Sequence, residues 1–450
     1  MNTLKNMKKN QNKMKIIKQV APYFVLFILS VYSANAQELL TIEDAVKIAL
    51  ENNYDIKIAK NDLKVDDANV SSGNAGMLPR ATATVTDNNS VQNLTQTRID
   101  GTENSLSNAK NNSLSYGVLL DWTVFDGLRM FARKEQLREL QKLGDAELKL
   151  AILTRISDVN ATYFNLVQQQ QQLAALDSTM IISNQRLDLA KNRFSIGKAS
   201  KLEVLNAQVD LNTDKVNLLR QKELYANTKT SLNEILARTV STDFTVVETI
   251  SIDNQLNLSE LMTLADNQNP MLQAQIINKR ISELQLKQVK AARYPTIRVS
   301  TGYNFGQSQS SLGFITQSTS RGLNYGFNAS LNLFDGNAQN RNEKIAKIQI
   351  ETAAAQIEQQ SLALQTQLTT AYQTYLTNLE LTDLEETNET IAKQNLDITL
   401  DKFRIGTITT LEFRTAQLNF VNAKVRFSNA QYQAKLSEIA LRELAGNLTF

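Results

Sequence analysis

The side chains best placed to do chemistry lie in two matching segments, "RFSIGKASKLEVLNAQ" at residues 193–208 and "KFRIGTITTLEFRTAQ" at residues 402–417. Each carries one carboxylate at the same position, Glu203 in the first and Glu412 in the second. The chain has no His and no Cys, which excludes thiol nucleophiles, Ser–His–Asp triads and His- or Cys-ligated metals. Because two isolated carboxylates form no catalytic constellation, we expect neither an enzyme nor a bound cofactor.

Both segments have the pattern of a tight reversal between two helices. Gly197 and Gly406, 406 − 197 = 209 residues apart, suit the left-handed conformation that ends a helix. Residues 200–203 and 409–412 each match a capping box, in which a hydroxyl and a carboxylate bind the free amides at the next helix start. Capping therefore explains both glutamates.

Capping does not explain the apolar residues at these turns, which are Ile196, Ile405 and Ile408. Apolar side chains at an exposed turn indicate a surface for a partner. Burial against a neighbouring helical hairpin of the same assembly is the alternative.

Few residues interrupt the chain, which has 15 Gly and 4 Pro in 450 residues. This composition predicts long helices, and the segments 127–197 and 336–406 each contain no Pro. A helix of that length is about 100 Å long. We expect Asp126 and Asp335 to cap the starts of these helices. The returning segments, about 201–237 and 410–445, are half as long and can stack end to end with the helices that open each half.

The second returning segment carries a seam of small and apolar residues in alternating steps of four and three, which is typical of a coiled coil. The seam consists of Ala416, Phe420, Ala423, Phe427, Ala430, Ala434, Ser437 and Leu441. A run of five glutamines, 168–172, is expected to form a solvated face of the first long helix.

The whole chain is organised as two similar halves. The segment "LTIEDAVKIALENN" at 40–53 aligns with "LNLSELMTLADNQN" at 256–269. We predict a first structural repeat at 37–238, a linker at 239–255 and a second repeat at 256–450. The halves differ in length within the polar stretches 87–114 and 306–322, which we expect to be loops.

Each half also contains two segments in which apolar residues alternate with polar ones. The clearest are "TIRVSTGYNF" at 296–305 and "NYGFNASLNL" at 324–333, with weaker counterparts at 81–85 and 116–124. This period predicts four strands of about ten residues, the length and pattern of transmembrane β-strands. A small soluble sheet is the alternative. Four strands cannot close a barrel in lipid, so copies of the chain must pool their strands.

The N-terminal segment resembles a targeting signal. Six lysines precede the apolar run 20–31, and Ala34-Asn35-Ala36 forms a small-residue cleavage site. We therefore predict a secretory signal peptide at 1–36, with a membrane anchor as the alternative. Without those lysines the net charge of +3 becomes 3 − 6 = −3, which removes the support for a nucleic-acid partner.

These features together resemble the TolC family of outer-membrane efflux proteins, from Leu40 to about Gly446. The resemblance implies an α+β membrane protein in which a long α-helical coiled-coil barrel continues a transmembrane β-barrel. It also implies a homotrimer with four strands per subunit and twelve in all, in the outer-membrane lipid of a Gram-negative bacterium with the helices in the periplasm. Such a protein is the passive exit duct of a tripartite efflux or type I secretion system. Its partners are a periplasmic adaptor and an inner-membrane pump.

The resemblance also assigns roles to the two turns. Ile196, Gly197 and Lys198 match a tip that contacts the adaptor, as do Ile405, Gly406, Thr407 and Ile408. Glu203 and Glu412 match acidic positions of the periplasmic gate. Thr415 stands where some members have a second acidic gate residue, and Ile408 where some have an arginine. These two departures leave open how the gate closes and whether it selects cations.

A different class of protein fits part of the same pattern. A secreted or surface coiled coil with a structural or adhesive role would have the long helices, with the strands as small caps. Such a protein would conduct no ions across a lipid bilayer, so conductance separates it from an exit duct.

Overall fold

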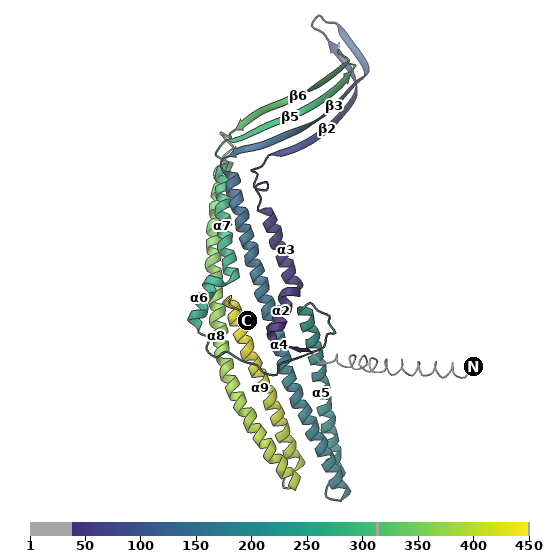
Figure 1. Ribbon diagram of the computed structural model, residues 1–450, viewed down its shortest axis with the longest axis vertical. Coiled ribbons are helices and arrows are strands. Elements are labelled where there is room, and N and C mark those ends of the chain that lie inside the picture. The colour runs from purple at the N-terminus through teal and green to yellow at the C-terminus, as the bar shows by residue number, and fades with distance from the viewer. Residues whose placement is uncertain (1–37, 312–314, 449–450) are drawn as a thin grey trace, which may run out of the picture.

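Four long helices form most of the molecule, as the computed structural model shows for residues 38–311 and 315–448 (Figure 1). The two longest are α4 (Arg129–Ser195, 67 residues) and α8 (Ala338–Ile405, 68 residues). Each turns back into a helix of 35 residues, α5 (Lys201–Ile235) or α9 (Thr410–Leu444). The predicted long helices and half-length returns are confirmed, and α4 and α8 are each about 100 Å long. The predicted signal peptide, residues 1–36, lies outside the described residues.

The predicted aspartates act at the starts of both long helices. Asp126 Oδ1 accepts a hydrogen bond from Met130 N at 3.2 Å, and Asp335 Oδ2 accepts one from Gln339 N at 2.9 Å. The residues that directly precede α4 and α8 are Leu128 and Asn337, both in the left-handed conformation and neither capping the helix with its side chain.

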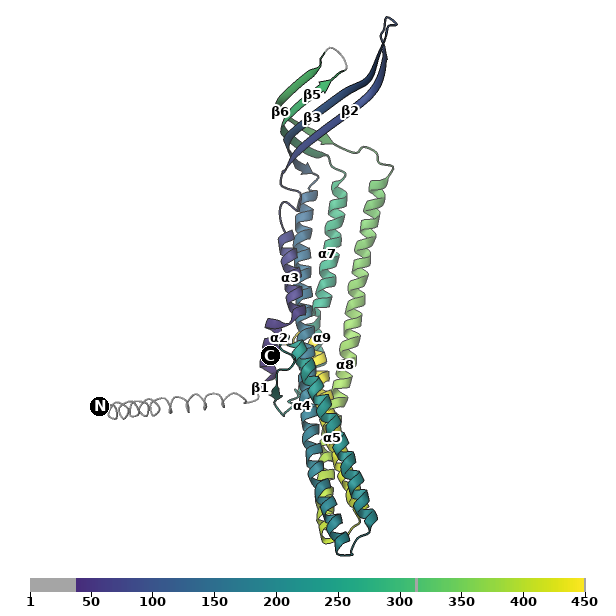
Figure 2. The ribbon, with the colours of Figure 1, turned by 90° about the vertical axis from the view of Figure 1, so that its right-hand side faces the viewer.

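Short helices complete the rods beside the long ones. They are α2 (Ile42–Asn52) and α3 (Tyr54–Asn69) in the first half, and α6 (Leu258–Gln268) and α7 (Pro270–Ala291) in the second. Figure 2 shows α3 and α7 above the ends of α5 and α9. A break in the helix precedes Pro270, and an equivalent break follows α2.

An asparagine joins the rods at each break. The Oδ1 of Asn53 accepts from Asp55 N at 2.9 Å, while its Nδ2 donates to Ile235 O, at the end of α5, at 2.8 Å. Asn269 repeats this arrangement, accepting from Met271 N at 3.0 Å and donating to Leu444 O, at the end of α9, at 2.9 Å. One side chain thus starts one helix and binds the carbonyl end of another.

A four-stranded antiparallel sheet lies beyond one end of the helices. Its strands are β2 (Arg80–Thr97), β3 (Glu103–Asp126), β5 (Thr296–Ser310) and β6 (Gln317–Ser330), in the order β2-β3-β5-β6. A separate parallel pair, β1 (Glu38–Leu40) with β4 (Phe244–Val246), lies against the helices.

The strands depart from the predicted boundaries. They contain 18, 24, 15 and 14 residues instead of about ten, and β6 ends before residues 331–333. Much of the polar stretch expected to be a loop at 87–114 continues the β2–β3 ladder, with pairs such as Asn88 with Ser113. Backbone hydrogen bonds build this ladder whatever the side chains, so alternation of apolar residues underestimates strand length where both faces meet water.

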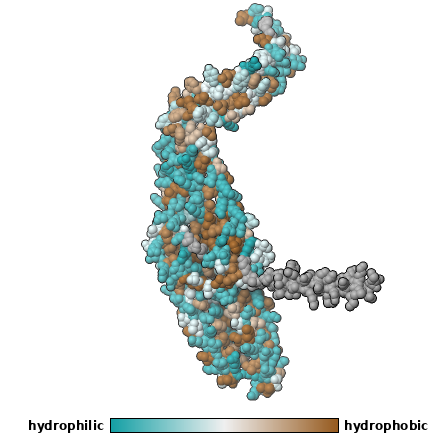
Figure 3. Space-filling model, viewed as in Figure 1, coloured by the Kyte–Doolittle hydropathy of each residue, from teal (hydrophilic) through white to brown (hydrophobic). Residues whose placement is uncertain are grey.

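The sheet has one apolar and one polar face. On the apolar face, Tyr116 stacks on Phe305 with ring centroids 4.9 Å apart, while Tyr325 and Phe327 are 82% and 78% exposed. The apolar rows extend from Ile297 to Phe305, which is about 27 Å at the usual rise of a strand. Figure 3 shows apolar side chains on the sheet beside its junction with the helices.

The packed core lies halfway along the helices, where the rods are joined. One cluster contains Leu40, Val159, Leu166 and Phe244, and a second contains Leu261, Leu368 and Leu441. The predicted seam on α9 is largely confirmed, because Ala416, Ala423, Ala434, Ser437 and Leu441 are buried.

The expectation for the five glutamines is wrong. Gln168 and Gln169 are buried, and Gln169 Nε2 donates to Thr228 Oγ1 on α5 at 3.0 Å. Gln172 Nε2 reaches Asn429 Oδ1 on α9 at 3.2 Å. Their long amides bridge α4 to two different helices, which a solvated face would not require.

Among the described residues, no helix is long and apolar enough to cross a membrane.

Candidate functional site at the helical tips

The two reversals at the far end of the helices share one backbone geometry. Gly197 and Gly406 have φ angles of +71° and +81°, so the predicted left-handed conformation is confirmed. Lys198 N donates to Arg193 O at 2.8 Å, and Thr407 N donates to Lys402 O at 3.0 Å. This bond across the last turn satisfies carbonyls that the end of the helix leaves free.

Only one of the two predicted capping boxes is complete. Glu412 N donates to Thr409 Oγ1 at 3.3 Å, and Thr409 N donates to Glu412 Oε2 at 3.0 Å. In the first turn, Ser200 Oγ accepts from Glu203 N at 3.3 Å, but Glu203 does not return the bond. The prediction is therefore wrong for half of the first box.

Glu203 binds the other hairpin instead. Its Oε1 accepts a hydrogen bond from Thr410 Oγ1 at 2.9 Å, and Arg193 Nη1 lies 3.9 Å away. Arg193 also crosses between the hairpins, donating from Nη2 to Phe403 O at 2.8 Å with its guanidinium 4.9 Å from the ring centroid. Two polar contacts thus connect the α4–α5 and α8–α9 hairpins close to their tips.

The predicted contact residues differ in exposure. Ile196 and Ile405 are 65% and 75% exposed, and Lys198 and Thr407 are exposed beside them. Ile408 differs because it is half-buried against the cluster of Leu396, Phe403 and Phe413. Its apolar character is therefore explained by packing within the chain, and exposure does not support a contact with a partner.

The remaining predicted gate residues make local contacts. Glu412 and Thr415 are exposed, and Thr415 Oγ1 donates to Leu411 O at 3.0 Å within α9. The structure brings Glu203 to the facing hairpin but assigns Glu412 to its own helix start.

A buried polar network behind the tips was missed by the sequence analysis. Arg414 on α9 forms a bidentate pair with Asp214 on α5, with Nη1–Oδ2 and Nη2–Oδ1 distances of 2.8 Å. Ser183 Oγ on α4 donates to Asp214 Oδ2 at 2.6 Å and accepts from Gln417 Nε2 at 3.0 Å. The network thus joins three helices from both halves.

A second ion pair extends this network. Arg186, 1% exposed on α4, binds the Asp210 carboxylate on α5. Asp210 and Asp214 are four residues apart, so they lie on one face of α5. That spacing was the available signal, but sequence alone does not identify arginines on other helices as their partners.

Among the described residues, no three His, Cys, Asp or Glu side chains form a group able to hold a metal ion. What the arrangement offers is a set of contacts that must break if the two hairpins move apart.

A family model described as outer membrane efflux protein matches residues 45–238 and 261–447. Outer membrane protein TolC of Escherichia coli is 20% identical over 346 residues, which cover 75% of this chain and 70% of TolC. TolC of Vibrio cholerae is 23% identical over 297 residues, 65% of this chain and 67% of that protein.

Solved structures show the same fold at low sequence identity. The Campylobacter jejuni CmeC outer membrane channel superposes with a TM-score of 0.75 at 17% identity, over 90% of this chain and 85% of CmeC. The outer membrane protein VceC of Vibrio cholerae gives a TM-score of 0.71 at 16% identity, over 90% of this chain and 96% of VceC. The boundaries of the two repeats and of the linker stay predictions. The matched segments cover most of the chain, which belongs to the outer membrane efflux protein family.

Proposed function

We propose that this protein is the outer-membrane exit duct of a tripartite efflux or type I secretion system, conducting cargo passively from the periplasm to the exterior. One observation carries the proposal: the sheet has an exposed apolar face and, among the described residues, β2 and β6 are unpaired at its edges. An apolar sheet with open edges is unstable in water and in lipid unless other strands close it.

Three copies of the chain would close the sheet. Four strands from each would give a twelve-stranded barrel, whose apolar rows of about 27 Å match the hydrocarbon region of an outer membrane. The polar faces would then line a water-filled interior, and the long helices would continue the tube through the periplasm.

The tips would form the gate and the docking surface. We assign the gate to Glu203, Glu412 and Thr415, and opening to separation of the hairpins that Glu203 and Arg193 connect. We assign adaptor contact to Ile196, Gly197, Lys198, Ile405, Gly406 and Thr407. The exposure of the two isoleucines supports this assignment, because capping gives them no role. An inner-membrane pump would supply the energy.

Fractionation and conductance test the duct itself. We expect a detergent-resistant trimer in outer-membrane fractions, and ion conductance when the purified protein is added to a lipid bilayer. A soluble periplasmic monomer, or a trimer that conducts no ions, would contradict the proposal. The second result would favour a structural coiled coil.

Crosslinking tests the docking surface. Because the chain has no cysteine, single variants Lys198→Cys and Thr407→Cys can be labelled specifically with a photoreactive group. We expect both to capture a periplasmic adaptor in cells, and a matched variant higher on α5, Lys222→Cys, to capture none. Equal capture by all three would argue against a docking surface at the tips.

A further inference from the structure

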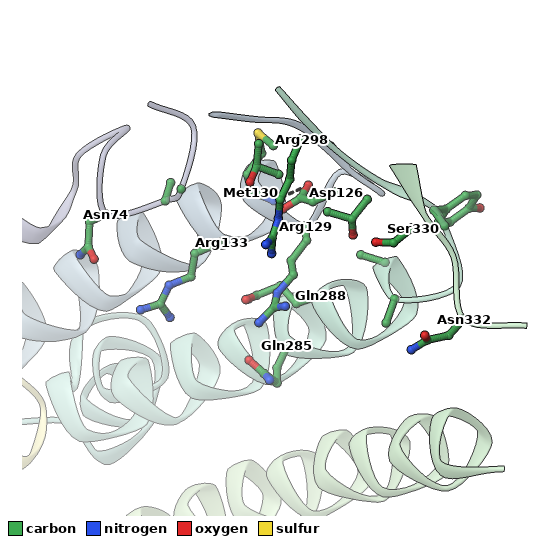
Figure 4. Close-up of a pocket in the computed structure, with 17 residues that line it drawn as sticks. Asn74, Asp126, Arg129, Met130, Arg133, Gln285, Gln288, Arg298, Ser330 and Asn332 are labelled. Atoms are coloured by element: carbon green, nitrogen blue, oxygen red, sulfur yellow. Dashed lines mark hydrogen bonds between the residues drawn. The ribbon is translucent and has the colours of Figure 1, made fainter. Parts of the chain in front are cut away.

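A cavity of about 650 Å³ lies where the helices meet the sheet. Figure 4 shows side chains from α4, from α7 and from the ends of the strands converging on it. The lining is mainly polar and includes the amides of Asn74, Gln285, Gln288 and Asn332. Neither the tips nor the apolar face of the sheet contributes to this cavity.

Three arginines line the cavity against a single carboxylate. Arg129 and Arg133 project from α4 and Arg298 projects from β5, whereas Asp126 is the only acidic residue of the lining. The formal charge of these four groups is 3 − 1 = +2. Like charges that line one cavity repel one another unless an anion or solvent lies between them.

Two of these arginines have no partner within the described chain. Arg133 donates from Nη1 to Gln136 Oε1 at 2.7 Å, but neither Arg129 nor Arg298 makes a side-chain hydrogen bond or ion pair with a described residue. Asp126, the acidic residue nearest to Arg129 in sequence, accepts a hydrogen bond from Met130 N. Their hydrogen-bonding capacity is therefore free for a ligand.

The start of α4 adds to the positive potential of the cavity. Arg129 is the first residue of α4, and the preceding Leu128 provides no side-chain cap. Asp126 binds one amide of this turn, Met130 N, and the amides that remain free carry partial positive charge and attract anions. This contribution reinforces the positive charge of the arginines.

The cavity opens on the polar face of the sheet. Thr296 and Arg298 alternate with Ile297 and Val299 of the apolar face, and Ser330 pairs with Thr296. In the proposed trimer, this face lines the interior, so three copies would place a collar of arginines between barrel and tunnel.

We propose that this cavity binds a phosphate-type oxyanion through Arg129 and Arg298, with Arg133 adding to the positive charge of the lining. Planar guanidinium groups bind such oxygens with paired hydrogen bonds, and several arginines around one cavity favour multiply charged groups. If the cavity faces the interior of the proposed trimer, the anion is carried on a solute in the duct. If it faces the membrane instead, the anion belongs to a lipid headgroup. The position on the interior rests on the proposed function, whereas binding itself does not.

Binding is tested on the full-length protein in detergent, by calorimetric titration with inorganic pyrophosphate in phosphate-free buffer. We expect Arg129→Gln and Arg298→Gln each to weaken binding about tenfold, as the loss of a charged hydrogen bond would. The control is Arg341→Gln, an exposed arginine near the start of α8 that does not line the cavity. No binding by the unaltered protein, or equal weakening in all three variants, would overturn the proposal.

Two further measurements distinguish the sources of the anion. A solute source predicts that pyrophosphate reduces conductance in a phosphatidylcholine bilayer, and that R129Q and R298Q relieve this block. A lipid source predicts that native mass spectrometry finds phosphatidylglycerol retained from mixed vesicles by the unaltered protein but not by the variants. If neither effect depends on the arginines, the cavity is not an oxyanion site. A protein that binds pyrophosphate but conducts no ions would instead contradict the exit duct.

Discussion

The α4–α5 and α8–α9 hairpins have the same backbone but use it differently. Both reverse at a left-handed glycine and begin the return helix with a hydroxyl cap. In the second hairpin, Glu412 closes its own capping box, whereas in the first, Glu203 binds Thr410 of the other hairpin. Local capping chemistry thus preserves the fold in both copies. The Glu203 carboxylate does not complete a capping box and instead connects the two hairpins.

The C-terminal ends of α5 and α9 also share one backbone conformation but differ in their contacts. Ala237 has a φ angle of +50°, while the equivalent residue after α9 is Gly446 with φ of +73°. A Cβ on Gly446 would lie 2.8 Å from Gln268 O, at the end of α6. The second half therefore packs more tightly at its joint, and only glycine fits there.

The largest expected effect comes from the buried network that couples the hairpins. Arg414→Ala leaves Asp214 buried without its partner, which typically costs about 3–5 kcal/mol. We expect faster amide hydrogen exchange in both hairpins near Ser183, Asp214 and Gln417, and a lower midpoint in denaturant. The double variant Arg414→Met with Asp214→Leu should recover most of the loss. If exchange changes in α9 alone, the hairpins are not coupled through this pair.

The joint between helices gives the next largest effect. Gly446→Ala combines a strained φ angle with contact against the backbone at Gln268 and should cost at least about 2 kcal/mol. Ala237→Gly relieves the strained φ angle, which should raise the free energy of unfolding by about 0.5–1 kcal/mol. The greater conformational freedom of glycine in the unfolded chain offsets part of this gain. Thermal unfolding of both variants checks the contrast. Equal and opposite shifts would indicate that conformation alone, without packing, distinguishes the two ends.

The carboxylates at the turns should have smaller and qualitatively different effects. Glu203→Ala and Thr410→Ala should each cost about 1 kcal/mol of contact between hairpins, and the double variant should cost no more than either one. Glu412→Ala should loosen the start of α9 only. We expect the first two variants to raise the conductance of the closed channel in bilayers more than Glu412→Ala does, because only they break a contact between the hairpins. Additive effects of the first pair would show that the two residues do not act on each other.

The smallest effect concerns pH at the end of α9. Burial, with a contribution from Asp158, raises the pKa of Glu443, although its hydrogen bond from Ser157 Oγ at 2.6 Å opposes the shift. A raised pKa means that the folded state holds the proton more tightly than the unfolded chain. The contribution of protonated Glu443 to the stability of the folded state is fully present below the ordinary glutamate pKa of 4.5. It is lost as pH rises through the raised pKa.

Glu443→Gln should therefore flatten the decline in melting temperature between acidic and neutral pH. Glu234, 443 − 209 = 234, is exposed at the matching position of the first half and provides the control. Thermal unfolding across this pH range distinguishes them. The same change in slope for Glu234→Gln would show that burial is not the cause.

Features that depend on local sequence could be predicted. The glycine turns, the long helices and most of the α9 seam follow from residue type and period, which neighbouring residues determine. The full length of β2 and β3 could not be predicted, because the residues beyond the apolar rows are nearly all polar. They show no alternation of apolar and polar side chains that would indicate a strand. The Arg414–Asp214 pair joins residues 200 positions apart, and no local pattern indicates which helices will meet. Gln168 and Gln169 were misassigned for the same reason, since their partners lie on other helices.

The continuous helices have a consequence for how the length of such a molecule can change. The rods α3–α5 and α7–α9 are joined at Asn53 and Asn269, but α4 and α8 span the full distance without a break, in 67 and 68 residues. Removing seven residues from α4 alone would displace its tip by about 10 Å, nearly two turns, relative to the tip of α8. Glu203 and Thr410 would then lie too far apart to form their hydrogen bond. A change in the length of the helical part that keeps the contacts between the tips therefore requires matched insertions or deletions in both halves.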